Sequence, residues 1–235
     1  MMKGKFYGIG VGPGDPELIT LKAISAIEKA DVLICPDAGN GKKSIALEIG
    51  EAYVKDSTER VPMTFPMVYD EHVLNKSWED NAVQIETFIN QGKNVAFITL
   101  GDPGVYSTFM YIVPFLVEKG IEIETIPGVT SFSAVASTMN LPICLWEETF
   151  TVVPLQKDVT SARIALENTD NVIIMKPSHA NKELAELLIE KGLDDKFVMI
   201  SKVSTDRQNI VRDINVLKDE KVPYMSTIIV KRKGI

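Results

Sequence analysis

Short apolar runs alternate with stretches of helical periodicity through the first 143 residues. The runs at 6–11 and 32–36 are too short for helices and end at glycine or proline, so they predict buried strands. Between them, apolar residues recur near helical spacing over 17–30. Further strands are expected at 94–100 and 122–126, and helices at 44–50, 78–91, 107–119 and 131–140. Strands that alternate with helices in this way predict a largely parallel sheet covered on both faces.

After Leu141-Pro142 the same alternation restarts. Strands are expected at 150–154, 171–176, 197–201 and 226–231, and helices at 161–168 and 181–191. The pattern predicts two α/β domains, over residues 1–143 and 144–235, with a cleft between them. Ligands of such sheets gather at the carboxyl ends of the strands.

A glycine-rich loop follows the first predicted strand and reads Gly8-Ile9-Gly10-Val11-Gly12-Pro13-Gly14-Asp15-Pro16. A dinucleotide fingerprint would need its third glycine at position 13 or 15. Pro13 lacks an N–H donor, and Asp15 at a helix N-terminus competes with a phosphate for the helix dipole. The loop therefore favours a neutral or cationic ligand, with a tight turn of structural purpose alone as the alternative.

Two more loops follow predicted strands, Leu100-Gly101-Asp102-Pro103-Gly104-Val105-Tyr106-Ser107-Thr108 and Ile126-Pro127-Gly128-Val129-Thr130-Ser131. Gly101 and Gly104 allow the backbone to approach a ligand, and Asp102 brings a carboxylate to the rim of the sheet. Each of these side chains could instead cap the helix that follows, as Asp, Ser and Thr commonly do. Three such loops at three strand ends together indicate a binding site.

Charge and composition exclude several classes of partner. The 235 residues include 25 Lys and Arg against 32 Asp and Glu, a net charge of −7, which does not favour a nucleic-acid backbone or an anionic membrane. Two cysteines and two histidines are too few for a disulfide framework or a Cys-rich zinc site. No signal peptide fits before the first loop. These observations predict a cytoplasmic protein with no protein-bound metal.

The ordered motifs resemble the tetrapyrrole (corrin/porphyrin) methylase family over nearly the whole chain. They are the loop from Gly10 to Ala23, Gly101-Asp102-Pro103, and Pro127-Gly128-Val129-Thr130-Ser131. The segments 99–108, 61–67 and 223–227 are similar to the branch of the family that methylates C-20 of precorrin-2 or cobalt-factor II. The resemblance implies S-adenosylmethionine as co-substrate, two α/β domains with mostly parallel or mixed sheets, an active site in the interdomain cleft, and a homodimer.

Positions that match the family's motifs identify candidate cofactor contacts. In the first domain these are Pro13, Gly101, Asp102, Val105, Tyr106, Thr130 and Ser131. In the second domain they are Met175, Val203, Ser204 and Ser226. A sulfonium cation in place of a phosphate accounts for the proline and the aspartate of the first loop.

The implied substrate is an anionic tetrapyrrole, so an acidic protein must offer basic groups locally. The candidates are Lys157, Lys176, Lys202, Arg207 and Arg212, with Lys3 and Lys5 as a second group and His179 as a possible donor. A base is also needed to remove the C-20 proton after attack. Asp102 and Tyr106, the titratable groups nearest to the expected methyl position, are the candidates.

Three other readings stay open. A Rossmann-type methyltransferase would use Gly8, Gly10 and Gly12 with Asp37 as ribose ligand, but it needs one large sheet. A second reading is a non-catalytic tetrapyrrole-binding module. The third is another transferase of the same family, acting on a different ring carbon or, like the diphthine-type methylases, on a protein.

Overall fold

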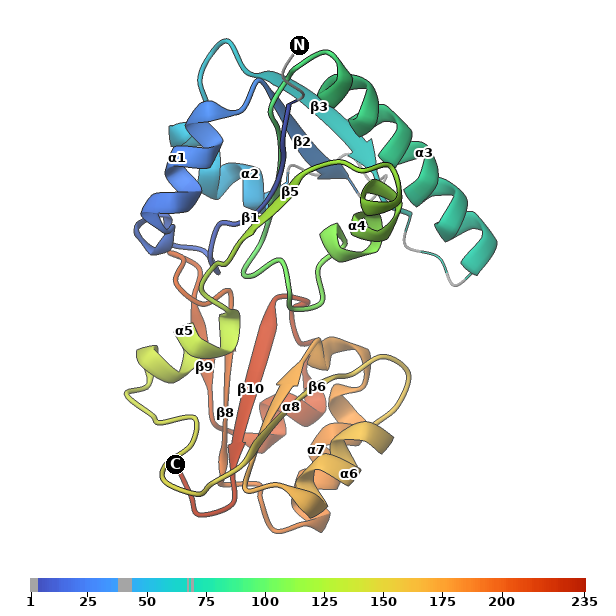
Figure 1. Cartoon of the computed structure of the whole chain (residues 1–235). Helices are drawn as coiled ribbons and strands as arrows, with labels where there is room; N and C mark the ends of the chain where they lie inside the picture. The colour runs from blue at the N-terminus through green and yellow to red at the C-terminus, as the bar shows by residue number, and fades with distance from the viewer. Residues whose placement is uncertain (1–3, 38–43, 67, 69) are drawn as a thin grey trace. The chain divides into compact units, whose positions relative to one another are not determined.

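The computed structural model describes residues 4–37, 44–66, 68 and 70–235. By their contacts, these residues form two compact units, Met1–Thr130 and Ser131–Ile235, here called unit 1 and unit 2 (Figure 1). The division falls earlier than the boundary expected at 143/144. The reason is that α5 (Ser131–Thr138) packs on a strand of unit 2 rather than on the sheet before it.

Unit 1 contains a five-stranded sheet in which every pair of neighbours is parallel. The spatial order is β3-β2-β4-β1-β5. The strands are β1 (Phe6–Gly10), β2 (Val32–Asp37), β3 (Glu59–Thr64), β4 (Val95–Thr99) and β5 (Ile123–Ile126). The expected parallel sheet is confirmed. β3 was not expected, because Pro62 interrupts it, and a proline is tolerated there since β3 lies at the edge of the sheet.

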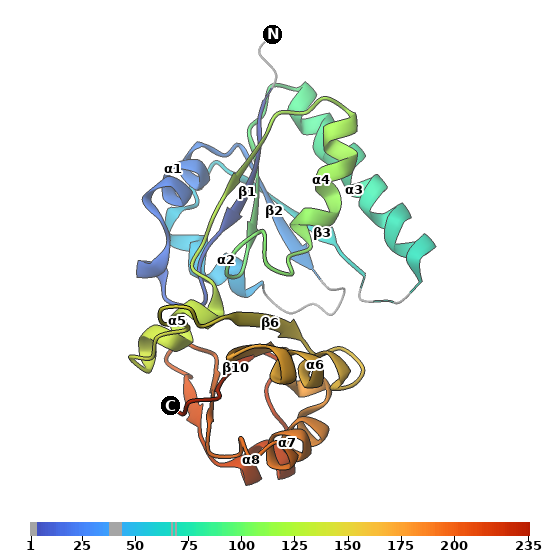
Figure 2. The ribbon, with the colours of Figure 1, turned by 60° about the horizontal axis from the view of Figure 1, so that its bottom comes forward.

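Helices cover both faces of this sheet (Figure 2). One apolar cluster joins the sheet to α1 (Leu21–Lys29) and α2 (Ile45–Gly50). A second joins the opposite face to α3 (Glu71–Asn90) and α4 (Phe109–Glu118). α3 begins seven residues before the expected start at 78, because the Asp70 carboxylate caps it by accepting the N–H groups of His72 and Val73.

Unit 2 contains a mixed five-stranded sheet in the order β6-β7-β10-β8-β9. β6 and β7 are parallel, whereas β10 runs antiparallel to both β7 and β8, and β9 antiparallel to β8. The strands are β6 (Phe150–Pro154), β7 (Asn171–Met175), β8 (Phe197–Ser201), β9 (Asn209–Val211) and β10 (Ser226–Lys231). Of these, β9 was not expected, since three residues are too short to give a periodic signal.

Three helices pack on one face of the second sheet and share its main apolar cluster. They are α6 (Thr160–Asn168), α7 (Asn181–Glu190) and α8 (Ile214–Asp219). α5 packs against β10, away from α6, α7 and α8 (Figure 2). Each unit therefore has its own sheet, its own helices and its own core.

Candidate functional site

The three loops predicted to bind a ligand follow three strands that are neighbours in the sheet of unit 1. They leave the carboxyl ends of β4, β1 and β5, which are adjacent in that order. All strands of the sheet are parallel, so the three loops emerge at one edge. The strand order thus brings together segments that are far apart in the sequence.

Backbone hydrogen bonds join the first loop to the second. The Gly101 N–H donates to the Gly12 carbonyl at 2.7 Å, and the Gly12 N–H donates to the Gly101 carbonyl at 3.3 Å. This reciprocal pair is an isolated antiparallel bridge beyond the end of the β1–β4 ladder. Both glycines have positive φ, +80° and +71°, a conformation that side chains rarely adopt.

The third loop contacts the other two so closely that side chains would not fit. A Cβ on Gly128 would lie 2.2 Å from the Gly101 carbonyl oxygen, and a Cβ on Gly10 would lie 2.5 Å from the same oxygen. The Gly101 carbonyl is therefore enclosed between the first and third loops. Glycine at these positions is required by the approach of backbone to backbone.

Asp102 links the second loop to the third through its carboxylate. Its Oδ1 accepts the N–H of Gly104 at 2.8 Å, and its Oδ2 accepts the N–H of Gly128 at 3.0 Å. Asp102 does not cap α4, since the Phe109 N–H donates to the Ser107 hydroxyl instead. Asp102 is thus first of all a positioning residue, and its role as a base stays a prediction.

Tyr106 lies in the same loop with a left-handed backbone, φ 52°, and its side chain is 48% exposed. Partial burial raises the pKa of its phenol above the ordinary value of 10. The phenol is therefore protonated at neutral pH, which favours a role as hydrogen-bond donor over the role of base. Val105 beside it is half-buried.

The first loop contains Pro13, which is buried, and Asp15, whose carboxylate is used locally. The Asp15 Oδ1 accepts the Glu17 N–H at 2.8 Å and caps a short 3-10 helix, Pro16–Leu18. The expected helix over 17–30 is divided here, because Thr20 caps α1 separately by accepting the N–H of Ala23. Asp15 is therefore both a cap and a negative charge beside the loop.

Thr130 and Ser131 fall where the two units divide. Thr130 is half-buried at the end of the third loop. The Ser131 hydroxyl, at the start of α5, is 2.9 Å from the hydroxyl of Thr227 on β10. That hydrogen bond fastens α5 to the second sheet.

The candidates in unit 2 meet at one edge of its sheet. Met175 ends β7, Val203 and Ser204 follow β8, and Ser226 begins β10, which runs the opposite way. Ser226 is buried, and its hydroxyl donates to the Pro223 carbonyl and contacts the Ser201 hydroxyl, both at 2.7 Å. Its side chain therefore stabilises the strand end, while its part in cofactor binding stays a prediction.

The basic candidates lie at opposite edges of the sheets, some at the amino ends of the strands and some at their carboxyl ends. Lys5 lies at the amino end of β1 and pairs with Glu122 at 2.7 Å and Glu124 at 2.8 Å, which raises the pKa of Lys5. Arg212 follows β9. Because β9 runs antiparallel to β8, Arg212 lies at the edge of the second sheet where β8 begins. The opposite edge of the second sheet, where β6, β7 and β8 end, carries Lys157, Lys176, Lys202 and Arg207. Lys3, and Met67 of the segment 61–67, lie outside the described residues.

Within the described part of the chain, no group of three His, Cys, Asp or Glu side chains is arranged to hold a metal ion. No helix among the described residues is long and apolar enough to cross a bilayer. Cys35 is half-buried in β2, where burial raises the pKa of its thiol. The separate sheets of the two units do not fit the single large sheet of a Rossmann-type methyltransferase.

Two five-stranded α/β units with three joined loops after β1, β4 and β5 agree with the family that the sequence motifs resemble. The profile of the tetrapyrrole (corrin/porphyrin) methylases matches residues 5–214, and the chain belongs to this family. The identification and the two-unit α/β fold expected from the motifs are confirmed.

Two curated relatives and one solved structure are similar to this chain over nearly its full length. A probable cobalt-precorrin-2 C(20)-methyltransferase of Methanocaldococcus jannaschii is 36% identical over 231 residues, covering 97% of this chain and 96% of that protein. A cobalt-precorrin-2 C(20)-methyltransferase of Salmonella typhimurium is 30% identical over 235 residues, covering 99% and 98%. A Thermus thermophilus uroporphyrin-III C-methyltransferase, solved with S-adenyl homocysteine, has the same fold, with a TM-score of 0.70 at 22% identity over 97% of both chains.

Proposed function

We propose that this protein transfers a methyl group from S-adenosylmethionine to C-20 of cobalt-factor II, or of precorrin-2, in the assembly of a corrin ring. One observation carries the proposal. Two relatives named cobalt-precorrin-2 C(20)-methyltransferase match this chain over nearly the full length of both partners, at 36% and 30% identity.

The loops of unit 1 fit the proposed cofactor by the chemistry of their groups. The segments 11–15, 100–108 and 126–130 contain no Lys or Arg, the residues that usually hold a phosphate, but they contain Asp15 and Asp102. S-adenosylmethionine has no phosphate and carries a sulfonium cation. Backbone groups of the glycine loops, with Pro13, Val105 and Thr130, are the contacts we propose in unit 1; Met175, Val203, Ser204 and Ser226 are those in unit 2.

When bound, S-adenosylmethionine supplies an electrophilic methyl group. The protein's part is then mainly to hold the ring carbon in line with that methyl, and positioning of this kind can lower a barrier by about 7–11 kcal/mol. The close backbone contacts among Gly12, Gly101 and Gly128 suit that task because they hold the three loops in fixed positions. Removal of the C-20 proton is assigned to Asp102, and Tyr106 is proposed as a hydrogen-bond donor beside it.

A preference for the cobalt-bound ring is a finer part of the proposal. Both relatives carry cobalt in their names. Cobalt enters only within the substrate, and the protein is proposed to hold no metal of its own. The metallated ring should show a specificity constant about tenfold higher than the metal-free ring, or ~1.4 kcal/mol of transition-state binding. Equal constants would remove the preference.

We also propose that the protein is a homodimer located in the cytoplasm. A homodimer follows from the family and from apolar side chains left exposed on α4, where Tyr111 is 52% and Val117 is 59% exposed. Sedimentation at micromolar concentration should show a dimer, and a 26.0 kDa species would contradict it. The cytoplasmic location and the absence of a nucleic-acid or membrane partner stay predictions.

The decisive experiment incubates the purified protein with S-adenosylmethionine and either cobalt-factor II or precorrin-2. Mass analysis should show one added methyl, and NMR should locate it on C-20. Methylation at another carbon would identify a different transferase of the family. Separately, S-adenosylhomocysteine at 100 times its dissociation constant should stabilise the protein by ~2.7 kcal/mol. Tetrapyrrole binding without this stabilisation would favour the non-catalytic module.

A further inference from the structure

Two lysines stand directly after the carboxyl ends of two strands in the second sheet. Lys176 follows β7, which ends at Met175, and Lys202 follows β8, which ends at Ser201. β10 lies between those strands, so the two lysines flank its first residues. Two strand spacings separate them, roughly 9–10 Å across the sheet. We call this pair the basic rim.

Both lysines have a left-handed backbone, with φ 56° at Lys176 and φ 50° at Lys202. Glycine or asparagine fits this conformation better than lysine does. Lys176 also precedes Pro177, a position that favours extended backbone. A charged side chain kept in a costly conformation at a strand end indicates that the charge has a use.

Charge is distributed unevenly between the units. Residues 131–235 hold equal numbers of acidic and basic residues, so the whole formal charge of −7 falls in residues 1–130. Elsewhere in unit 2, the ammonium groups of Lys191, Lys231 and Lys233 each lie near a glutamate. Among the described residues, no ion pair forms on Lys202. The basic rim thus leaves a cation at the edge where the predicted contacts of unit 2 gather.

We propose that Lys176 and Lys202 bind carboxylates of the tetrapyrrole substrate. The inference rests on the proposed function and names the residues that recognise its polyanionic substrate. Two lysines whose backbones lie roughly 9–10 Å apart on one sheet suit a ligand with several separated carboxylates. The single carboxylate of S-adenosylmethionine is the other possible occupant, and the experiment below distinguishes the two.

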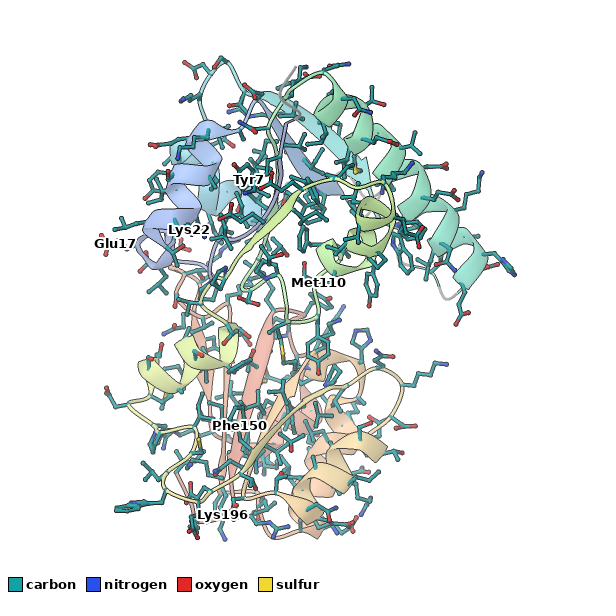
Figure 3. All side chains as sticks on the ribbon, viewed as in Figure 1. Tyr7, Glu17, Lys22, Met110, Phe150 and Lys196 are labelled. Atoms are coloured by element: carbon teal, nitrogen blue, oxygen red, sulfur yellow. The ribbon has the colours of Figure 1, made fainter. Side chains whose placement is uncertain are left out.

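The test compares two lysines at the two ends of the same strand. Lys202 follows β8 and Lys196 precedes it, and both are half-buried; Figure 3 labels Lys196 at the amino end of that strand. The variants Lys202→Gln, Lys176→Gln and Lys196→Gln each remove one charge. Uroporphyrin III, an unreactive ring with many carboxylates, serves as the probe, titrated at low and high salt with S-adenosylhomocysteine titrated in parallel.

We expect Lys202→Gln and Lys176→Gln each to weaken uroporphyrin binding by roughly three- to tenfold at low salt, and less at high salt. Lys196→Gln should bind as the unchanged protein does. Affinity for S-adenosylhomocysteine should not move in any variant. Lys202→Gly should raise the melting temperature by relieving the left-handed backbone, yet weaken porphyrin binding as much as Lys202→Gln, which separates charge from stability.

Equal porphyrin affinity in Lys202→Gln and Lys196→Gln would overturn the proposal. So would a loss confined to S-adenosylhomocysteine, which would assign the rim to the cofactor. Turnover keeps the two proposals apart. A protein that methylates precorrin-2 at C-20 with an unchanged KM after Lys202→Gln retains the proposed function and loses the rim. A protein whose rim variants lose porphyrin binding, but which transfers no methyl, retains the rim and loses the function.

Discussion

The carboxyl edges of the two sheets are built by different means. In unit 1 the three loops are joined by the backbone bridge between Gly12 and Gly101 and by backbone N–H groups that donate to the Asp102 carboxylate. In unit 2 the edge is held by side-chain hydroxyls, such as those of the buried pair Ser201 and Ser226. A joint of backbone against backbone tolerates one residue type only, whereas a joint of side chains tolerates several. The first edge should therefore be the less tolerant of substitution.

The same contrast appears in the segment of unit 2 that follows α5. The segment after α5 is fastened to the second sheet by Lys231, whose ammonium donates to the carbonyls of Pro142 and Ile143 and to the Asn171 side chain. Lys231 also lies 3.6 Å from Glu148, which Lys233 contacts at 2.9 Å. In unit 2 a side chain holds a connecting segment in place, whereas in unit 1 backbone contacts at glycines hold the loops in place.

The largest effect is expected from Gly128→Ala. The new Cβ would lie 2.2 Å from the Gly101 carbonyl oxygen and 2.8 Å from the carbonyl carbon of Gly10, so backbone must move. We expect a loss of roughly 3 kcal/mol in the free energy of unfolding and a loss of S-adenosylhomocysteine binding. Urea unfolding and calorimetry measure the two. Gly50→Ala is the control, since its Cβ finds ordinary contacts at 3.7 Å or more and should be tolerated.

Lys231→Met tests the side-chain joint of unit 2. The lysine side chain is only 8% exposed, and methionine keeps its apolar stem while leaving three oxygen acceptors without their donor. We expect a loss of about 2 kcal/mol in the free energy of unfolding. Lys233→Met removes a charge from the same Glu148 at a side chain that is 71% exposed, and should cost less than about 1 kcal/mol. Equal costs would contradict the role assigned to Lys231.

Asp102→Asn removes one acceptor from the joint between the second and third loops. An amide offers one oxygen in place of two, so the N–H of Gly104 or of Gly128 loses its partner. We expect a loss of about 1–2 kcal/mol in stability, with slower turnover and S-adenosylhomocysteine binding still measurable. Asp15→Asn is the matched control for stability, because asparagine caps a helix about as well as aspartate. Unchanged single-turnover methylation in Asp102→Asn would remove Asp102 from the chemistry.

The smallest effect concerns acid. Hydrogen bonds from Lys233 and Asn171 lower the pKa of Glu148 from 4.5 to about 2. A carboxylate with a lowered pKa stabilises the fold above its ordinary pKa and loses that contribution as the pH falls through the folded value. The stability difference between the unchanged protein and Glu148→Gln should therefore shrink from about pH 5 to about pH 2. Urea unfolding of both proteins at each pH measures this difference.

Much of the first unit could be predicted from the sequence because its signals are local. Apolar runs that end in glycine indicate parallel strands. The three loops can be recognised in the sequence because their backbone contacts require glycine at Gly10, Gly101 and Gly128. The start of α3 was missed, although Asp70 gives a capping signal, because the apolar spacing becomes clear only after Trp78. The edge strand β3 was missed as well, owing to its proline.

The sequence by itself determined the α/β class, the two sheets, the positions of the three glycine loops at strand ends and the family. Tertiary structure decided what those residues do. Asp102 joins two loops because β4 and β5 both neighbour β1, and Lys5 is paired at the far edge of the same sheet. Lys176 and Lys202 share an edge because β7 and β8, each antiparallel to the β10 strand between them, run in the same direction. Strand order and direction come from the packing of whole sheets and helices, and so no local pattern of residues encodes them.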